Sequence, residues 1–162
     1  MSSKLGILFV CLGNICRSPT AESVFASKVE AAGLSDQLRI DSCGTQNYHP
    51  GKPPDGRSTV VAAQRGYRLD QLRARVLRPD DFETFDYILA MDKSNLRDVL
   101  GICPSTFRDK IRLFLSFASD LGEEEVPDPY FGDGSGFDTV LDLIEAASDG
   151  LIQHLRDEGK CA

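Results

Sequence analysis

Two cysteines and an arginine stand close together where an apolar run of the sequence ends. Residues 7–23 read ILFVCLGNICRSPTAES, with Cys11 directly after the apolar run and Arg17 six positions later, beside Cys16. A cysteine thiolate is a nucleophile, and a guanidinium donates two parallel hydrogen bonds to a tetrahedral oxyanion, which an ammonium does not. The spacing of Cys11 and Arg17 therefore predicts covalent chemistry on a bound phosphate.

The surrounding residues predict a strand, a tight loop and a helix that would position these side chains. Residues 5–10 are apolar enough for a buried strand, and residues 18–33 follow a helical pattern. A loop that turns between the two aims successive backbone N–H groups inward, and Gly13 and Asn14 tolerate the left-handed backbone that it needs. The helix signals are Ser18 as N-cap, Pro19 in the first turn and Gly33 beyond the last turn.

A cysteine in such a loop is expected to be a thiolate at neutral pH, because a helix N-terminus and a nearby cation favour the charged form. The loop would hold a phosphate against the sulfur of Cys11, which predicts hydrolysis of a phosphate ester through a phosphocysteine. A single cysteine after a buried strand is usually inert, so the prediction depends on the whole C-x5-R-S pattern. A nucleotide-binding loop is excluded because residues 5–27 contain no lysine.

The composition is typical of one soluble domain. The chain has 162 residues, of which 41% are hydrophobic and 27% charged, and no apolar run approaches the length of a membrane span. Its net charge of −7 disfavours nucleic acid or anionic lipid as partners. The N-terminus lacks a signal peptide, which predicts a cytoplasmic protein. Five unevenly spaced cysteines predict free thiols, and His49 and His154 are interpreted as loop and helix-surface residues, so no metal and no cofactor are expected.

The remaining pattern alternates strands and helices. This order predicts an α/β fold with a four-stranded, mostly parallel sheet and helices on both faces, whose ligand binds beyond the carboxyl ends of the strands. The predicted strands are 38–44, 85–92 and 111–117. The predicted helices are 58–66, 93–100 with Gly101 as a stop, and one that begins at Phe137, and the loops are 46–57 and 118–136.

Four segments resemble one family over nearly the whole chain. FVCLGNICRSP, DSCGT, the MD pair at 91 and 92, and VPDPYFGD are similar to the low-molecular-weight protein tyrosine phosphatases. The resemblance implies a flavodoxin-like domain over residues 1–162, with a phosphate-binding loop between its first strand and first helix. It also implies hydrolysis of phosphotyrosine in proteins and of small aryl phosphates, by a monomer that forms at most a weak dimer.

The resemblance also implies roles for individual residues. Cys11 would be the nucleophile, Arg17 the phosphate clamp, and Asp128 the general acid that later activates water, although an Asp-Pro pair in a loop is otherwise a common turn. Ser18 would donate its hydroxyl to Cys11. The loop that binds phosphate would comprise Leu12, Gly13, Asn14, Ile15, Cys16 and Ser18, with Ser42 as scaffold.

Three aromatic residues and one acid complete the predicted site. Tyr48, Tyr130 and Phe131 would form walls that stack on the phenyl ring of the substrate, or they are surface packing. Asp92 would support the loop from behind, or form a structural ion pair. The sequence departs from the family pattern at Cys43, where alanine is usual, and at Phe131, which replaces the second of two tyrosines and leaves Tyr130 as the one phosphorylation site there.

Cys16 is not placed for attack on phosphorus. If the loop brings its α-carbon within about 7 Å of that of Cys11, a disulfide between them would capture a sulfenic acid on Cys11 before further oxidation. The alternative is a small filler of the loop.

Two other functions fit part of the pattern. A thioredoxin-linked arsenate reductase shares the fold and the Cys-x5-Arg loop, but its relay needs two further cysteines close together, whereas Cys43, Cys103 and Cys161 are far apart in the sequence. A non-catalytic phosphotyrosine-binding module would not need both Cys11 and Asp128. Turnover of para-nitrophenyl phosphate separates the phosphatase from both.

Overall fold

The first strand, β1 (Leu5–Cys11), lies inside the sheet, because its apolar residues are buried on both of its faces. In the computed structural model, which describes residues 4–129 and 136–162, it is followed by the loop 12–16 and then by α1 (Arg17–Ala31). The predicted strand, loop and helix are therefore all present. Gly33, with φ of 76°, ends the helix as expected.

Three further strands complete a parallel sheet in the order β2-β1-β3-β4. They are β2 (Leu38–Gly44), β3 (Tyr87–Ala90) and β4 (Ile111–Leu113), and the parallel pairing places Cys11 opposite Gly44. The predicted α/β fold with four parallel strands is confirmed. Because the strand order reverses at β1 and β3, the carboxyl ends of these strands form the crevice where this kind of fold binds ligands.

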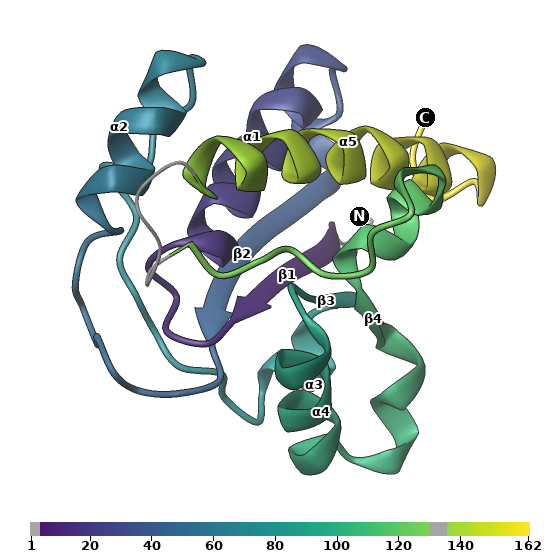
Figure 1. Cartoon of the computed structure of the whole chain (residues 1–162). Coiled ribbons are helices and arrows are strands. Elements are labelled where there is room, and N and C mark those ends of the chain that lie inside the picture. The colour runs from purple at the N-terminus through teal and green to yellow at the C-terminus, as the bar shows by residue number, and fades with distance from the viewer. Residues whose placement is uncertain (1–3, 130–135) are drawn as a thin grey trace.

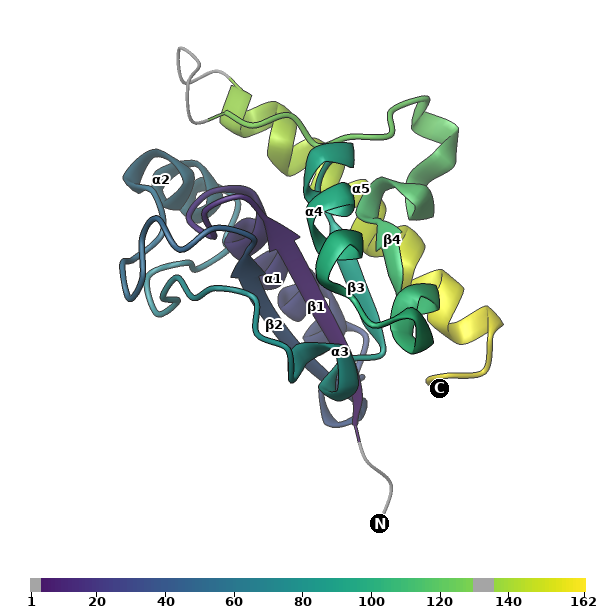
Figure 2. The ribbon, with the colours of Figure 1, turned by 90° about the horizontal axis from the view of Figure 1, so that it is seen from below.

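Helices cover both faces of the sheet (Figure 1). One face packs against α1 and α5 (Gly136–Asp157), and the other against α3 (Asp81–Thr84) and α4 (Lys93–Ile102). Figure 2 shows α2 (Gly56–Gln64) beyond the carboxyl ends of β1 and β2, on the side of the loop 12–16. Short 3-10 helices are η1 (Ser35–Gln37), η2 (Ser105–Lys110) and η3 (Phe114–Leu121).

The core under α1 and α5 is built around Phe9 of β1. Its ring meets those of Phe25 and Phe114 edge-on, with centroids 5.7 Å and 4.9 Å apart. These contacts fix the start of α1, and therefore Arg17, against the end of β1. No helix in residues 4–129 or 136–162 is long and apolar enough to cross a membrane.

Several predicted boundaries are wrong for identifiable reasons. Residues 114–117 continue into η3 rather than β4, so that Phe114 and Leu115 both reach the same core, which alternation along a strand would prevent. Gly101 lies inside α4, which ends at Ile102, because Pro104 restricts the residue before it. Ser18 is not the N-cap of α1. Cys16 occupies that position, and the Ser18 hydroxyl points into the site instead.

Candidate active site

The loop 12–16 curls around the sulfur of Cys11 with its carbonyl groups turned outward. The backbone N–H groups of Thr45, Gln46 and Asp55 donate to the carbonyls of Cys11, Leu12 and Ile15 at 2.9, 3.0 and 2.7 Å, respectively. Asn14 has a φ of 58°, the left-handed conformation that the sequence predicted for this region. The outer side of the loop is thus pinned to β2 and to the segment before α2.

The loop also carries backbone donors for which the described part of the chain provides no acceptor. The backbone N–H groups of residues 13–17 donate no hydrogen bond to any other residue within 4–129 or 136–162. They belong to the loop and to the first turn of α1, whose dipole favours negative charge. Because buried N–H groups are almost always paired, these donors indicate a site for a polyvalent anion.

Gly44 permits this loop to approach β2. A β-carbon at this position would lie 2.7 Å from the carbonyl oxygen of Leu12 and 3.1 Å from the backbone nitrogen of Asn14. Any side chain at this position would push the loop away from the strand. Gly44 is therefore required by the loop geometry, a role that no pattern in the sequence indicated.

Cys11 is buried and shares a short polar contact with Ser18. The two atoms, Sγ and Oγ, are 3.0 Å apart, and Asn14 Nδ2 donates to the same Ser18 oxygen at 2.8 Å. Since a hydroxyl has a single proton, Ser18 donates it either to the sulfur or to the carbonyl of Cys43, which lies at 3.3 Å. A thiolate on Cys11 is the stronger acceptor, so ionisation turns this proton toward the sulfur.

Arg17 is almost completely buried beside the loop, with 2% of its side chain exposed. Its Nη1 donates to Asp92 Oδ2 at 2.6 Å and to the carbonyl of Val126 at 3.0 Å. Burial favours the neutral form, but the charges of Cys11, Asp92 and Asp128 outweigh it and raise the pKa of Arg17. The guanidinium is thus held in place as a cation from behind the pocket.

Asp92 follows β3 and serves two elements at once. Besides the contact with Arg17, its Oδ1 accepts the backbone N–H of Asn95 at 2.7 Å and so caps α4. The sequence left support of the loop and a structural ion pair as alternatives for Asp92. The geometry combines them, because the ion pair is itself the contact that holds Arg17.

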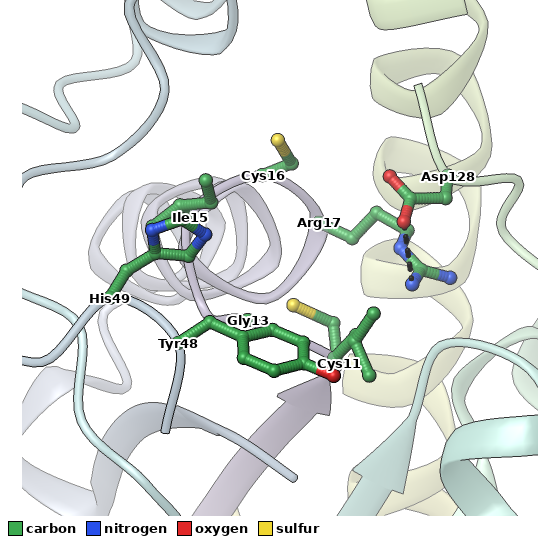
Figure 3. Close-up of a pocket in the computed structure, with 9 residues that line it drawn as sticks. Cys11, Gly13, Ile15, Cys16, Arg17, Tyr48, His49 and Asp128 are labelled. Carbon is green, nitrogen blue, oxygen red and sulfur yellow. Dashed lines mark ion pairs between the residues drawn. The ribbon is translucent and has the colours of Figure 1, made fainter. Parts of the chain in front are cut away.

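Asp128 lies on the far side of the pocket from the walls formed by Tyr48 and His49 (Figure 3). Its loop is tied to β3 by the bond from the Val126 N–H to the Met91 carbonyl, at 2.8 Å. One Asp128 oxygen is 3.5 Å from Arg17 Nη2, and 31% of the side chain is exposed. The carboxyl group therefore reaches both the pocket and solvent.

The walls of the pocket come from the loop 12–16 and from residues before α2. Leu12 and Ile15 provide apolar surface, and Tyr48, which is 62% exposed, stands at the mouth. His49 also lines the pocket and lies over Gly13. The sequence interpretation missed His49, because the signal available was only its position next to Tyr48. The predicted walls Tyr130 and Phe131 lie outside the described residues.

Cys16 lines the same pocket as Cys11, and both are free thiols. Burial, followed by the charge of Asp55, raises the pKa of Cys16 to about 12, so Cys16 stays a neutral thiol. Cys43, Cys103 and Cys161 are also free and buried. Within the part of the chain that the structure describes, no group of His, Cys, Asp or Glu side chains is arranged to hold a metal ion.

Comparison with known proteins gives one consistent family. The model of the low molecular weight phosphotyrosine protein phosphatases matches residues 6–161. The low molecular weight phosphotyrosine protein phosphatase of Schizosaccharomyces pombe is 45% identical over 153 residues, which cover 93% of this chain and 97% of the relative. Both the family model and the relative thus extend over almost the whole chain.

Solved structures agree with this match. A protein tyrosine phosphatase from Entamoeba histolytica superposes with a TM-score of 0.92 at 41% identity, covering 97% of this chain and 99% of the other. A Drosophila arginine phosphatase has a TM-score of 0.84 at 34% identity, covering 91% of this chain and 96% of the other.

Proposed function

The chain belongs to the low molecular weight phosphotyrosine protein phosphatase family, and from this premise we propose that Cys11, Arg17 and Asp128 are its catalytic residues. The family membership makes the protein a cysteine-dependent protein-tyrosine phosphatase. The observation that carries the residue assignment is the set of backbone N–H groups of residues 13–17, which have no acceptor among the described residues and belong to the loop that lines the pocket of Cys11. These donors and Arg17 match the oxygens of a phosphate dianion.

The first half of the reaction transfers the phosphoryl group to sulfur. The Cys11 thiolate attacks phosphorus, the bond from phosphorus to the phenolic oxygen breaks, and its electron pair goes to that oxygen. Asp128 gives its proton to the departing phenolate, which avoids the release of a free anion. The loop N–H groups and Arg17 stabilise the charge on the three equatorial oxygens throughout.

The second half returns the enzyme to its starting state. Asp128, now a carboxylate, takes a proton from a water molecule, whose oxygen attacks phosphorus as the sulfur–phosphorus bond breaks. The electron pair returns to Cys11, and inorganic phosphate leaves. The Ser18 hydroxyl, 3.0 Å from the sulfur, stabilises the thiolate that departs in this step.

The substrate is a protein that carries phosphotyrosine. Tyr48, His49 and Ile15 line a slot whose walls fit a flat phenyl ring, while the phosphate reaches the loop at its base. Small aryl phosphates fit the same slot. The net charge of −7 argues against nucleic acid and anionic membranes as partners. In this proposal the protein is a monomer with one domain over residues 1–162, and it acts in the cytoplasm.

Oxidation of Cys11 regulates this activity. Peroxide that enters the pocket converts the Cys11 thiolate to a sulfenic acid, whose oxygen leaves as water when the Cys16 sulfur attacks and a disulfide forms. Because the raised pKa keeps Cys16 as a neutral thiol, this capture is slow. Phosphate bound in the loop protects Cys11, and a thiol reductant restores activity.

The choice of substrate is tested by comparing kcat/KM for phosphotyrosine peptides, phosphoserine peptides and phosphoarginine. Phosphotyrosine is expected to be preferred by a wide margin, since the slot is lined by an aromatic ring at its mouth. Phosphoarginine is included because one structural relative is named an arginine phosphatase. A kcat/KM for phosphoarginine above that for phosphotyrosine would contradict the proposed substrate.

A further inference from the structure

Glu22 is a partly buried carboxyl group that the reaction described above does not use. It lies on α1, five residues after Arg17, and faces β2. Its Oε1 accepts a hydrogen bond from Ser42 Oγ at 2.6 Å. Glu22 forms no ion pair with another residue in the described parts of the chain, which is unusual for a carboxylate removed from water.

The contact with Ser42 is the end of a chain of hydrogen bonds that begins at the nucleophile. Cys11 Sγ is 3.0 Å from Ser18 Oγ, and Asn14 Nδ2 donates to Ser18 at 2.8 Å and to Ser42 at 3.0 Å. Ser42 then donates to Glu22. The other end of the Asn14 amide is also fixed, because its Oδ1 accepts the backbone N–H of Arg75 at 2.9 Å.

Two contacts set the directions of the bonds in this chain: the Arg75 N–H, which fixes the Asn14 amide, and the charge of Glu22, which decides where the Ser42 proton goes. A carboxylate has no proton to give, so Ser42 must donate its only proton to Glu22 and accept from Asn14. The amide then points both of its N–H groups at serine oxygens. A protonated Glu22 removes this constraint, because its own O–H competes with the Asn14 amide for the Ser42 oxygen.

We propose that ionised Glu22 is a positioning residue of the phosphatase reaction, which takes the only proton of Ser42 and so leaves the Ser42 oxygen to accept from Asn14, the side chain that also donates to Ser18 beside the sulfur. This inference rests on the proposed function, in which the Cys11 thiolate attacks in the first step and departs in the second. Glu22 touches neither the substrate nor the sulfur, and it acts only through Ser42 and Asn14.

The surroundings of Glu22 make its charge costly at neutral pH. Burial raises the pKa of Glu22 to about 7, and the charge of Asp41 on β2 adds to this, whereas the bond from Ser42 and the charge of Arg75 oppose it. Arg75 forms ion pairs with Asp41 and Asp81, at 2.9 and 3.0 Å. Its positive charge therefore offsets the negative charge of Glu22 only in part. Glu30 and Arg68 line the same surface depression.

The sign of the effect on stability follows from linkage. Between the ordinary pKa of 4.5 and about 7, the folded protein keeps a proton on Glu22 that the unfolded chain has lost. The free energy of unfolding therefore falls as the pH rises through this window and is lowest above it. A carboxyl group that served only the stability of the fold would not be expected to lower the free energy of unfolding at neutral pH in this way.

The test replaces Glu22 by a neutral group of the same shape. At pH 8, Glu22→Gln is expected to unfold at a higher urea concentration than the parent, yet to lose about tenfold in kcat for para-nitrophenyl phosphate, the equivalent of one hydrogen bond. The loss has a structural cause, because the new amide can donate to the Ser42 oxygen and so compete there with the Asn14 amide. Glu30→Gln, on the same helix, is the matched control and should leave kcat and KM unchanged.

A second measurement follows the chemical reactivity of the Cys11 sulfur itself. The rate at which iodoacetamide alkylates Cys11 should show a step near pH 7 in the parent that is absent in Glu22→Gln. In Ser42→Ala the chain is already broken, so adding Glu22→Gln should have no further effect on kcat. A stable Glu22→Gln variant with parental kcat, or multiplicative losses in the double variant, would overturn the inference. Failure of the proposed function is distinguishable, since it would show as turnover by Cys11→Ser.

Discussion

At the residue scale, Arg17 is held from behind before any substrate arrives. Its Nη1 donates to Asp92 and to the carbonyl of Val126, while its Nη2 lies 3.5 Å from the carboxylate of Asp128. This arrangement fixes the plane of the guanidinium, so little conformational entropy is lost when it binds phosphate. The ammonium group of a lysine has no plane that such contacts could orient.

Arg17→Lys is therefore expected to lower kcat/KM for para-nitrophenyl phosphate by about 10²–10³, the usual effect of removing a donor from developing oxyanions. The measurement is steady-state kinetics at saturating and limiting substrate. Retention of near-normal kcat by the lysine variant would show that Arg17 is not the phosphate clamp. Arg39→Lys, on an exposed part of β2, serves as the control.

Asp128→Ala separates protonation of the leaving group from attack on phosphorus. Its kcat should fall severalfold more for phosphotyrosine peptides than for aryl phosphates with acidic phenols, because a good leaving group needs little protonation. A plot of log kcat against the pKa of the leaving phenol should thus become steeper. An unchanged slope would assign the acid to another residue.

The residues that we propose as catalytic could be located in the sequence because their pattern is local. Cys11 and Arg17 lie within one loop, and Asp128 is marked by a short motif. His49 and Glu22 could not be predicted in this way. Each acquires its place from a contact across the fold, His49 from the approach of its loop to Gly13, and Glu22 from the pairing of β2 beside α1.

At the element scale, the site depends on where β3 ends and α4 begins, because Asp92 both caps α4 and holds Arg17. Asp92→Asn keeps a side chain that caps helices well, but it removes the charge facing Arg17. Asp92→Ala removes both. Comparison of the two variants therefore separates the role of Asp92 as the cap of α4 from its role as the charge that holds Arg17.

Both Asp92 variants are expected to lower kcat and to lose stability from the broken ion pair with buried Arg17, and Asp92→Ala should lose about 1 kcal/mol more than Asp92→Asn because its cap is missing. Urea unfolding gives the free energies, and kinetics on para-nitrophenyl phosphate gives the rates. Full activity in Asp92→Asn would mean that the negative charge is not needed to hold Arg17.

The elements themselves were predictable where burial follows a simple pattern. The apolar run of β1 marks a buried strand, and the spacing of apolar residues in α5 marks a helix with one apolar face. The prediction of a single strand over residues 111–117 is wrong, because the first residues of this run form the edge strand β4 and the next ones form η3. Apolar content alone does not distinguish the two, since both bury apolar side chains, Ile111 of β4 in the core on the side of α4, and Phe114 and Leu115 of η3 in the core on the side of α1 and α5.

At the scale of the whole molecule, the anion site is linked to the stability of the fold. The loop joins β1 to α1, and its inner N–H groups are without protein acceptors among the described residues. A phosphate that binds only the folded state should stabilise it by about 2.7 kcal/mol at one hundred times its Kd. For a domain of this size that corresponds to roughly 5–10 °C in Tm.

Differential scanning calorimetry with phosphate, and with chloride at equal ionic strength, measures this coupling. Phosphate should raise the Tm of the parent, while chloride should not, and the shift should be much smaller in Arg17→Lys. Equal shifts in the parent and the variant would place the bound phosphate elsewhere on the molecule.

The overall topology could be predicted because alternating strands and helices with apolar strands leave few arrangements other than a parallel sheet with two covered faces. The same topology explains the position of the chemistry. Cys11 stands at the carboxyl end of β1, where the strand order reverses, and Asp92 follows β3 beside it.

The central claim is that the phosphoryl group passes through the sulfur of Cys11, and trapping that adduct tests it most directly. In Asp128→Ala, transfer from para-nitrophenyl phosphate should remain fast while hydrolysis is slowed, so the intermediate should accumulate. Rapid acid quenching followed by peptide mass spectrometry is expected to find one phosphoryl group on Cys11, and none in Cys11→Ser. A phosphoryl group on another residue, or continued turnover by Cys11→Ser, would contradict the account.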